Sequence, residues 1–468
     1  MVASRGPSAV VDQLVAVSNR LPITWNHVSQ EWHLSAGGLA KSLHSSLSNH
    51  GGIWVGSLGG ASDEHPAEVT HEGVRLAPVA VDHDKYSVYY SEVSNGVLWP
   101  LLHDGLRSID IRDEAWLSYV EVNEEFARRA VAVADPEAIF WVHDYHLFLV
   151  PAMIRKLRPE ARIGFFLHVP FPPTELFERL PWKSEILLGV LGSDLVGMHV
   201  SSYLENFAAS VERHSLASTS IDQIHLANRA TRLIATPISV DVATIEKSVG
   251  VESFASRVRD LRRQLGAVGE IIVGIDRMDY TKGIVPRLLA FEAALESGAI
   301  SPQTKLVQVA VPTRESVAGY EEERAEVERI VGRINGKFAS LGSPAVHYVY
   351  RTLEMSELLE LYAAADVMAV TPYRDGLNLV AKEFVAARVD ESGVLLLSEF
   401  AGVAEEFKDA VLVNPYSMSD LVEGMATALR MSHSESQTRM KSLRATVHSH
   451  TLSDWTDTFV EQLTACGR

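Results

Sequence analysis

The sequence predicts an α/β protein with two doubly wound parallel sheets, one in each half of the chain. Short apolar runs alternate with longer amphipathic segments from one end of the chain to the other. Several runs contain no polar residue, which is typical of strands buried on both faces of a parallel sheet. The 468 residues, 47% hydrophobic and 22% charged, have the composition of a globular protein and the length of about two to four domains. Sustained strand–helix alternation favours parallel strands joined by right-handed crossovers.

The individual elements follow from where the apolar runs and the amphipathic segments fall. The expected strands are 10–17, 53–55, 138–142, 162–168, 195–198, 232–236, 271–275, 305–311, 345–348, 367–371 and 393–397. The expected helices include 287–297, 320–336, 355–365 and 377–388, with a last amphipathic segment at 455–463. Pro237 ends a strand, so we expect an N-terminal domain of residues 1–237 and a C-terminal domain of residues 238–451. The final helix, at about 452–468, can pack on either half, including back onto the N-terminal domain.

The charge balance limits the partners of the protein. Lys and Arg number 42 against 60 Asp and Glu, which gives a net charge of −18. An acidic field of this size repels nucleic acid and anionic lipid. An anionic ligand would therefore need cations that are gathered locally.

Cysteine usage and hydropathy favour a cytoplasmic protein. Cys466 is the single cysteine, so the sequence excludes an intramolecular disulfide and a zinc site with several thiolates. A chain of this kind suits a reducing compartment. We expect no signal peptide and no membrane span, because neither a cationic start with a long apolar run nor about 18 consecutive apolar residues occurs.

Ligands of open parallel sheets bind beyond the carboxyl ends of the strands, and the first polar cluster at such a position surrounds Arg20. Arg20 follows the opening strand, and Gly37 and Gly38 open the next helical segment. Free N–H groups at the glycine pair and the guanidinium of Arg20 can bind a phosphate. A simple turn with a tight helix–strand contact explains the same residues.

The second cluster is His143-Asp144-Tyr145-His146, at the end of the 138–142 strand. A carboxylate between two histidines can accept from sugar hydroxyls, act as a general base or hold a metal. The two histidines lack the i, i+4 spacing of a helical zinc pair, so ligand binding and a structural hydrogen-bonded cluster remain the main alternatives.

The third cluster is His168 with the turn that follows it. Pro170, Pro172 and Pro173 fix the backbone of this turn, which suits a side chain that must be held in place. A satisfied core histidine is the alternative.

The fourth cluster opens the first strand–helix turn of the second half. Arg277 and Lys282 lie five residues apart, and Gly283 allows close backbone approach, which favours a binding site for a diphosphate. The run is neither a Walker A loop nor a Gly-x-Gly-x-x-Gly motif, and a solvated charged turn remains possible.

The fifth cluster lies where a helix is expected to begin. Asp375 and Gly376 come before this helix, so the N–H groups of Gly376, Leu377, Asn378 and Leu379 would lie at its positive end. Glu383 follows about one and a half turns later and can reach a ribose diol. N-cap chemistry explains Asp375 alone but not the whole run.

Together these motifs resemble the trehalose-6-phosphate synthases, retaining glycosyltransferases whose two Rossmann-like domains face a cleft (the GT-B type). The resemblance runs from about Val15 to about Leu463. It implies glucose transfer from UDP-glucose to glucose 6-phosphate, with retention of the α configuration, giving α,α-trehalose 6-phosphate and UDP. It also implies front-face attack assisted by the leaving phosphate, and no cofactor.

The resemblance assigns residues to both substrates. For glucose 6-phosphate these are Arg20, Trp54, Tyr90, Trp99, Asp144 and Arg314. For the nucleotide sugar they are Gly37, Gly38, His168, Arg277, Lys282, Asp375, Gly376, Leu377, Asn378, Leu379 and Glu383. Among these, Asp144, His168, Arg277, Lys282 and Asp375 are the catalytic candidates.

We expect no metal site, because Arg277 and Lys282 can neutralise the diphosphate. Asp82-His83-Asp84 has the Asp-x-Asp form of metal-dependent glycosyltransferases, but no apolar strand precedes it, so we interpret it as a turn or surface segment.

Several alternatives stay open from the sequence. The stretch 349–356, where the nucleotide base is expected, varies within the family, so GDP-glucose is an alternative donor. A pseudo-glycosyltransferase that couples a cyclitol nucleotide to an aminocyclitol phosphate, and an inactive sugar-phosphate sensor, would use the same scaffold. The family often forms dimers or tetramers, and a homo-oligomer is possible here.

Overall fold

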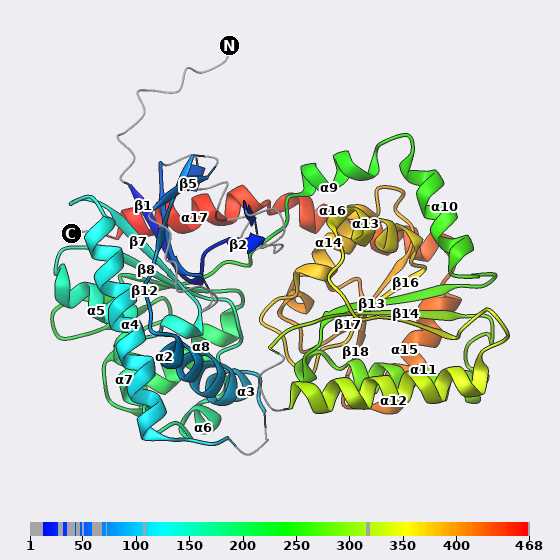
Figure 1. Cartoon of the computed structure of the whole chain (residues 1–468), viewed down its shortest axis with the longest axis horizontal. Helices are drawn as coiled ribbons and strands as arrows, with labels where there is room; N and C mark the ends of the chain where they lie inside the picture. The colour runs from blue at the N-terminus through cyan, green and yellow to red at the C-terminus, as the bar shows by residue number, and fades with distance from the viewer. Residues whose placement is uncertain are drawn as a thin grey trace, which may run out of the picture. The chain divides into compact units, whose positions relative to one another are not determined.

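The computed structural model describes residues 13–26, 31–34, 43, 47–48, 51–58, 68–71, 73–105, 109–314 and 319–466. The chain divides into two compact units (Figure 1). One unit comprises residues 1–236 and 453–468, and the other comprises residues 237–452. Each unit has its own sheet and its own core.

The sheet of the N-terminal unit is mostly parallel. Its strands are β1 (Leu14–Arg20), β4 (Ile53–Ser57), β5 (Val69–His71), β6 (Val74–Pro78), β7 (Ile139–His143), β8 (Arg162–Leu167), β9 (Leu195–Met198), β10 (Ser218–Thr219), β11 (Gln223–His225) and β12 (Ala230–Ala235). Over the described residues their order is β10-β11-β12-β9-β8-β7-β1-β4-β6-β5. The strands from β12 to β6 pair in parallel, while β10, β11 and β5 add antiparallel edges. The order runs outward from β1 on both sides, so this doubly wound sheet has its switch point between β1 and β7. A separate two-stranded sheet pairs β2 (Ile23–Asn26) with β3 (Glu31–Leu34) in antiparallel.

Helices cover both faces of this sheet. They are α2 (His83–Ser87), the π-helix η1 (Val88–Leu98), α3 (Trp99–Leu102), α4 (Asp113–Val133), η2 (Tyr145–Leu147), α5 (Val150–Leu157), α6 (Thr174–Phe177), α7 (Lys183–Val190), α8 (Ser201–Arg213) and α17 (Leu452–Ala465). Successive residues of a strand point to opposite faces. On β7, Phe140 lies under the guanidinium of Arg158 at the end of α5, whereas the ring of Trp141 stacks on Phe459 of α17 at 4.5 Å. Helix α17 therefore covers the face opposite α5.

Two strand glycines explain how α17 lies so close to the sheet. A Cβ on Gly164 of β8 would lie 2.6 Å from the ring of Phe459, and one on Gly197 of β9 would lie 2.8 Å from it. Real Cβ atoms do not approach so closely, so only glycine leaves room for this ring. The last helix thus returns to the N-terminal unit.

The sheet of the C-terminal unit is wholly parallel over the described residues. Its strands are β13 (Ile271–Arg277), β14 (Lys305–Val311), β15 (Val346–Val349), β16 (Val367–Val370), β17 (Val394–Ser398) and β18 (Val411–Val413). They are arranged as β15-β14-β13-β16-β17-β18, which is the 3-2-1-4-5-6 order of a dinucleotide-binding fold. Its switch point lies between β13 and β16.

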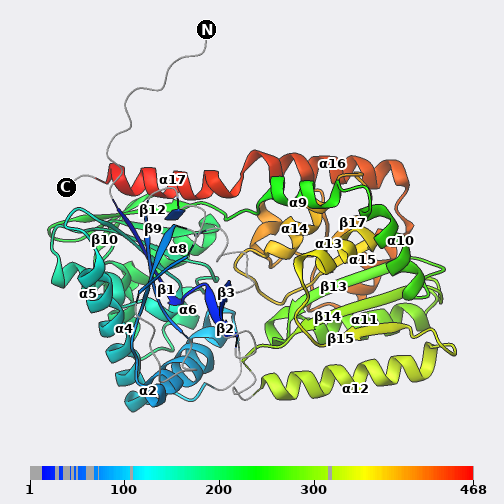
Figure 2. The same cartoon turned by 45° about the horizontal axis from the view of Figure 1, so that its top comes forward.

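Helices flank this second sheet on both faces. They are α9 (Val242–Val249), α10 (Phe254–Gln264), η3 (Tyr280–Lys282), α11 (Ile284–Glu296), α12 (Tyr320–Phe338), α13 (Met355–Ala364), α14 (Leu379–Ala387), η4 (Gly402–Glu405), α15 (Met418–Arg430) and α16 (His433–Ser449). Helices α11, α12 and α15 lie on one face, and α13 and α14 lie on the other with α9 and α10 (Figures 1 and 2). No helix in the described part of the chain is long and apolar enough to cross a membrane.

The α/β prediction with two parallel sheets is confirmed, and each expected strand is present within a few residues. Residues 10–12 of the first expected strand lie outside the described residues, and this strand continues to Arg20. The helix expected at 377–388 begins at Leu379, because the side chain of Asn378 caps it by accepting from the N–H of Ala381 at 3.0 Å. Asp375 is therefore not the N-cap.

The segment 82–84 is exposed, as expected, but it is the start of a helix rather than a turn. The carboxylate of Asp82 accepts from the N–H of Lys85 at 3.0 Å and caps α2.

Candidate functional site

Predicted site residues lie at the switch points of both sheets. Arg20 is the last residue of β1, and Asp144 directly follows β7. In the other unit Arg277 is the last residue of β13, and the segment 371–378 follows β16. These are the strand ends at which open α/β sheets bind ligands.

Asp144 has a backbone conformation that is normally restricted to glycine. Its φ is 74° and its ψ is 167°, a region that costs a non-glycine residue about 1–3 kcal/mol. Its N–H donates to the carbonyl of Phe166 at 2.8 Å, and its Oδ1 accepts from the N–H of His168 at 3.2 Å. Bonds to β8 thus fix Asp144, and they place its carboxylate beside His168.

His168 also contacts the histidine that precedes Asp144. Nδ1 of His143 lies 3.1 Å from Nε2 of His168, and the two rings stack. Burial, and then the neighbouring His168, lower the pKa of His143 well below its usual value. Burial lowers the pKa of His168 to about 3. Both rings are therefore neutral at neutral pH.

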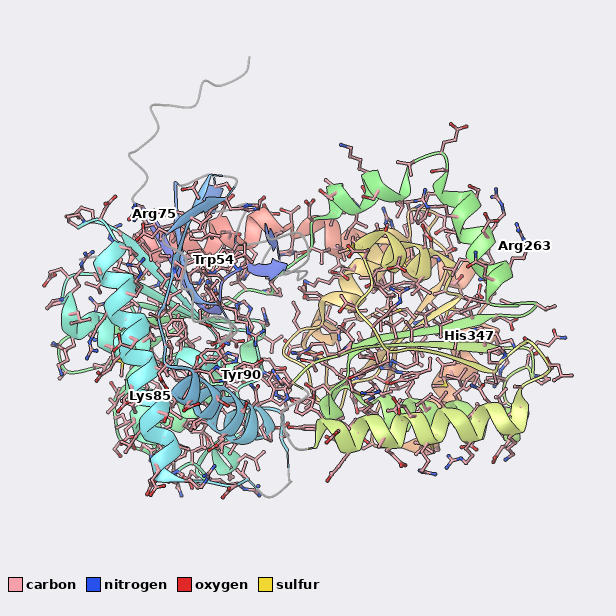
Figure 3. All side chains as sticks on the ribbon, viewed as in Figure 1. Trp54, Arg75, Lys85, Tyr90, Arg263 and His347 are labelled. Carbon is pink, nitrogen blue, oxygen red and sulfur yellow. The ribbon has the colours of Figure 1, made fainter. Side chains whose placement is uncertain are left out.

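Arg20 and Tyr90 contact each other. The guanidinium of Arg20 lies over the Tyr90 ring, 5.1 Å from its centroid, at the distance of a cation–π contact. Figure 3 shows Tyr90 and Trp54, which belong to different elements of the N-terminal unit. Trp54 donates from Nε1 to Oγ of Ser18 at 2.7 Å, and Ser18 donates to the carbonyl of Arg20 at 2.8 Å. Trp54 is only 2% exposed and Trp99 only 4% exposed.

The π-helix η1 connects Tyr90 to the Asp144 loop. Asn95 donates from its side chain to the carbonyl of Tyr90 at 2.8 Å and accepts from the hydroxyl of Tyr145 at 2.9 Å. Trp99 follows η1, and its ring lies 5.7 Å from that of Tyr145. Such π-helical turns are rare and frequent at functional sites. Apolar periodicity does not detect one, so the sequence did not predict it.

In the C-terminal unit, Lys282 and Asp375 form an ion pair across the switch point. Nζ of Lys282 donates to Oδ2 of Asp375 at 2.7 Å, and both side chains are mostly buried. Asn378 donates to the same oxygen at 3.0 Å. The structure therefore brings together three of the residues predicted for the nucleotide sugar.

A buried carboxylate joins the other two predicted cations. Oδ2 of Asp279 lies 3.8 Å from Arg277 and 3.5 Å from Arg314, and Oδ1 accepts from the N–H and hydroxyl of Thr281. Arg314 also donates to the hydroxyl of Tyr320 at 2.6 Å. Burial alone would raise the pKa of Asp279, but Arg314, Arg277 and Lys282 outweigh it and lower the pKa.

Arg287 supports these loops from beneath. This fully buried side chain donates to Asp276 at 2.5 Å, to the hydroxyl of Thr371 at 3.0 Å and to the carbonyl of Lys282 at 3.4 Å. It thereby joins the loop after β13 to the loop after β16. The sequence signal was a lone cation within the apolar stretch of 284–294.

The remaining predicted residues have simpler surroundings. Glu383 of α14 accepts from the hydroxyl of Tyr362 at 2.8 Å. The carbonyl of Gly376 packs so closely on Gly402 that a Cβ there would lie 2.1 Å from it, and the carbonyl of Leu377 accepts from the N–H of Val403 at 3.0 Å. Gly37 and Gly38 lie outside the described residues.

No three His, Cys, Asp or Glu side chains of the described residues gather in a way that could hold a metal ion. Independence from metal stays a prediction.

The fold and the residues at its switch points define a class of protein, the GT-B glycosyltransferases. A crystal structure of a UDP-forming α,α-trehalose-phosphate synthase from Burkholderia xenovorans in complex with glucose-6-phosphate is 33% identical, with a TM-score of 0.89 over 97% of this chain and 100% of that chain. An E. coli structure bound with UDP-2-fluoro glucose is 32% identical, with a TM-score of 0.89 over 97% of this chain and 99% of that chain.

The family within this class follows from sequence similarity. The model of glycosyltransferase family 20 matches residues 12–465. The trehalose-6-phosphate synthase of Mycolicibacterium gilvum is 41% identical over an alignment of 479 positions, gaps included, which covers 98% of this chain and 95% of that protein. The synthase of Mycobacterium avium is 42% identical over an alignment of 469 positions, gaps included, which covers 97% of this chain and 95% of that protein. The chain belongs to glycosyltransferase family 20.

Proposed function

We propose that the protein is a retaining glucosyltransferase that makes α,α-trehalose 6-phosphate and UDP from UDP-glucose and glucose 6-phosphate. The carrying observation is a match over 97% of the chain to the UDP-forming synthase that holds glucose-6-phosphate. The placement of predicted site residues at both switch points supports the same activity.

The donor is assigned to the residues around the β13–β16 switch point. Arg277 and Lys282 bind the diphosphate, Asp375 and the N–H groups of 376–379 position the transferred glucose, and Glu383 binds the ribose hydroxyls. The Lys282–Asp375 bond supports this assignment, because it fixes a cation and a sugar-hydroxyl acceptor next to each other. His168, with Gly37 and Gly38, completes the donor set by resemblance.

The acceptor is assigned to a second group of residues. Arg20 and Arg314 bind its phosphate, since guanidinium groups match phosphate oxygens in geometry and charge. The resemblance adds Tyr90, Trp54 and Trp99 to this group, and Asp144 accepts from the hydroxyls of the sugar. The strained backbone of Asp144 supports this role, because such strain accumulates at functional sites.

The chemistry follows from fixed charges. The bond between the anomeric carbon and the diphosphate breaks, and Arg277 and Lys282 stabilise the negative charge that develops on the leaving UDP. The anomeric hydroxyl of glucose 6-phosphate attacks from the same face, and its proton passes to the leaving phosphate. No metal is required, because the two cations perform the neutralisation.

We further propose that the protein acts in the cytoplasm and that its donor nucleotide is UDP. The single cysteine suits the cytoplasm, where UDP-glucose-dependent synthesis would take place. We favour UDP over GDP because of the relatives described as UDP-forming.

The test is nucleotide release by the purified protein with UDP-, GDP- and ADP-glucose and with a cyclitol nucleotide, each with and without glucose 6-phosphate and with and without EDTA. We expect release from UDP-glucose only with glucose 6-phosphate, unchanged by EDTA, and a product identified as trehalose 6-phosphate. Release only from a cyclitol nucleotide would contradict the function, as would no release with any pair. Strict dependence on manganese would contradict the metal-free chemistry.

A further inference from the structure

His143 is a buried histidine for which the proposed reaction has no assigned use. It is the last residue of β7, has no exposed surface and packs against the ring of Trp141 at 4.7 Å. Within the described residues, the one hydrogen bond of its side chain joins Nδ1 to Nε2 of His168 at 3.1 Å. Because both rings are neutral, this bond contains one proton, which belongs to one of the two nitrogens.

The surroundings of His143 decide which nitrogen has the proton. Nε2 of His143 is buried and has no hydrogen-bond partner among the described residues. If His168 donated, then His143 would be protonated at Nε2 and would bury an unpaired N–H. If His143 donates from Nδ1, then only a lone pair is left unpaired at Nε2. Buried N–H groups without a partner are rarer than under-used acceptors, so His143 is the donor.

We propose that His143 is a positioning residue that holds His168 in the tautomer with its proton on Nδ1. His168 is partly exposed, and its Nδ1 makes no hydrogen bond within the described residues. Its backbone N–H is held by the carboxylate of Asp144. The ring therefore presents a hydrogen-bond donor to its ligand. This inference rests on the proposed function, in which His168 contacts the transferred glucose, and that ligand atom is then a sugar oxygen acting as acceptor.

The tautomer can be measured directly. Long-range ¹H–¹⁵N spectra of the histidine-labelled full chain at pH 7 distinguish Nδ1–H from Nε2–H rings, and the His168 signals are assigned by their loss in His168→Asn. We expect the Nδ1–H form in the wild type. His143→Asn should keep it, because an asparagine NH₂ group lies near the position of Nδ1 and can donate. His143→Leu should lose it. An Nε2–H ring in the wild type, or an unchanged ring in His143→Leu, would overturn the proposal.

Kinetics separate positioning from a general loss of structure. His143→Leu should lower kcat with UDP-glucose by about 10- to 100-fold, the usual effect of one lost or mispaired buried hydrogen bond, and should leave KM for glucose 6-phosphate unchanged. His143→Asn should recover most of the activity. Equal losses in the two variants would show that the ring only fills space.

A packing control is available next to the same ring. His199 is buried, and its ring lies 5.4 Å from that of His168. His199→Leu removes a neighbouring ring but not the donor, so the His168 tautomer should stay as in the wild type. If the wild type transfers no glucose, the proposed function fails, whereas the spectra still decide whether His143 sets the tautomer.

Discussion

Lys282 donates from Nζ to Oδ2 of Asp375 at 2.7 Å, although the two residues lie 93 positions apart in the chain. The bond connects the loop after β13 to the loop after β16, which the 3-2-1-4-5-6 strand order makes neighbours. Asn378 donates to the same carboxylate oxygen. A cation held in this way needs little rearrangement when charge develops on a leaving group, which is the requirement for electrostatic catalysis.

Lys282→Met should lower kcat by about 10²- to 10³-fold, the usual effect of removing one fixed group that stabilises developing charge. KM for glucose 6-phosphate should change little. Lys282→Arg should not restore kcat, since a planar guanidinium does not replace a compact ammonium. The measurement is UDP release at saturating substrates.

Lys305 provides the matched control for this experiment. It is 7% exposed, lies in the same sheet and donates to the carbonyl of Pro344 at 2.9 Å. Lys305→Met removes a buried cation away from the proposed site, so it should affect thermal stability but not kcat. If Lys282→Met kept kcat within about threefold of the wild type, then Lys282 would not be the group that stabilises the leaving nucleotide.

Arg314→Ala should weaken the binding of glucose 6-phosphate far more than the binding of UDP. Charge-assisted hydrogen bonds contribute about 1.5–3 kcal/mol, so a loss of about 10- to 150-fold in acceptor affinity is expected. Titration calorimetry with each ligand separately gives both affinities. If the binding of both ligands were weakened equally, the assignment of Arg314 to the glucose 6-phosphate subsite would be wrong.

Tyr320→Phe tests whether Arg314 needs its neighbour. The Tyr320 hydroxyl accepts a hydrogen bond from Arg314 at 2.6 Å. Replacing Tyr320 by phenylalanine removes this bond but leaves the charge of Arg314 intact. Tyr320→Phe should weaken the binding of glucose 6-phosphate less than Arg314→Ala does, and it should leave the binding of UDP unchanged.

The sequence predicted the sheets better than it predicted the network beneath the site. Uninterrupted apolar runs such as 305–311 form strands in both the prediction and the structure, because burial on two faces leaves few alternatives. The Arg277 to Lys282 motif was found because its cations are close in sequence. Pairing across the sheet was not predictable in detail, since the Lys282–Asp375 bond depends on strand order.

Two further features of the site could not be predicted from the sequence, because they depend on backbone geometry and on contacts between distant segments. Asn378 rather than Asp375 caps α14, because the helix begins two residues later than expected, a shift that helix propensity does not resolve. Asp279 lies inside the predicted motif, yet its buried contacts with Arg277 and Arg314 become visible only when the loop after β14 is placed.

Asp279 should make the stability of the protein depend on pH. Because its pKa in the folded state is lowered below the ordinary value of 3.8, its stabilising contribution is complete at neutral pH and is lost as the pH falls below about 4 and through the folded-state pKa. Asp279→Asn should therefore lower the free energy of unfolding by about 3 kcal/mol at pH 7. The difference in Tm from the wild type should narrow towards pH 3.

Asp260 is the control for this pH experiment. Its carboxylate pairs with the exposed Arg263 at 2.7 Å, and exposed pairs of this kind contribute little. Asp260→Asn should change Tm little at any pH. A Tm difference for Asp279→Asn that stays constant from pH 7 to pH 3 would show that the carboxylate is not the ionised partner of the cations.

Gly283→Ala and Gly298→Ala form a matched pair at the two ends of α11. Both glycines have positive φ values, 65° and 69°, so each alanine incurs the same backbone penalty of about 1–2 kcal/mol. A Cβ at Gly298 meets nothing within 4 Å, whereas a Cβ at Gly283 would lie 2.2 Å from the carbonyl oxygen of Thr371. Gly283→Ala must therefore displace the loop that carries Asp375.

We expect Gly298→Ala to lower the free energy of unfolding by the backbone penalty alone and to leave kcat unchanged. Gly283→Ala should lower the free energy of unfolding by about 1–3 kcal/mol more, because of overpacking. It should also lower kcat, because the Lys282–Asp375 bond joins the two loops that the new methyl group pushes apart. Thermal unfolding and UDP release on both variants measure the two effects. Equal stability and equal kcat in the pair would show that the close approach of Gly283 to Thr371 has no part in holding the donor loops together.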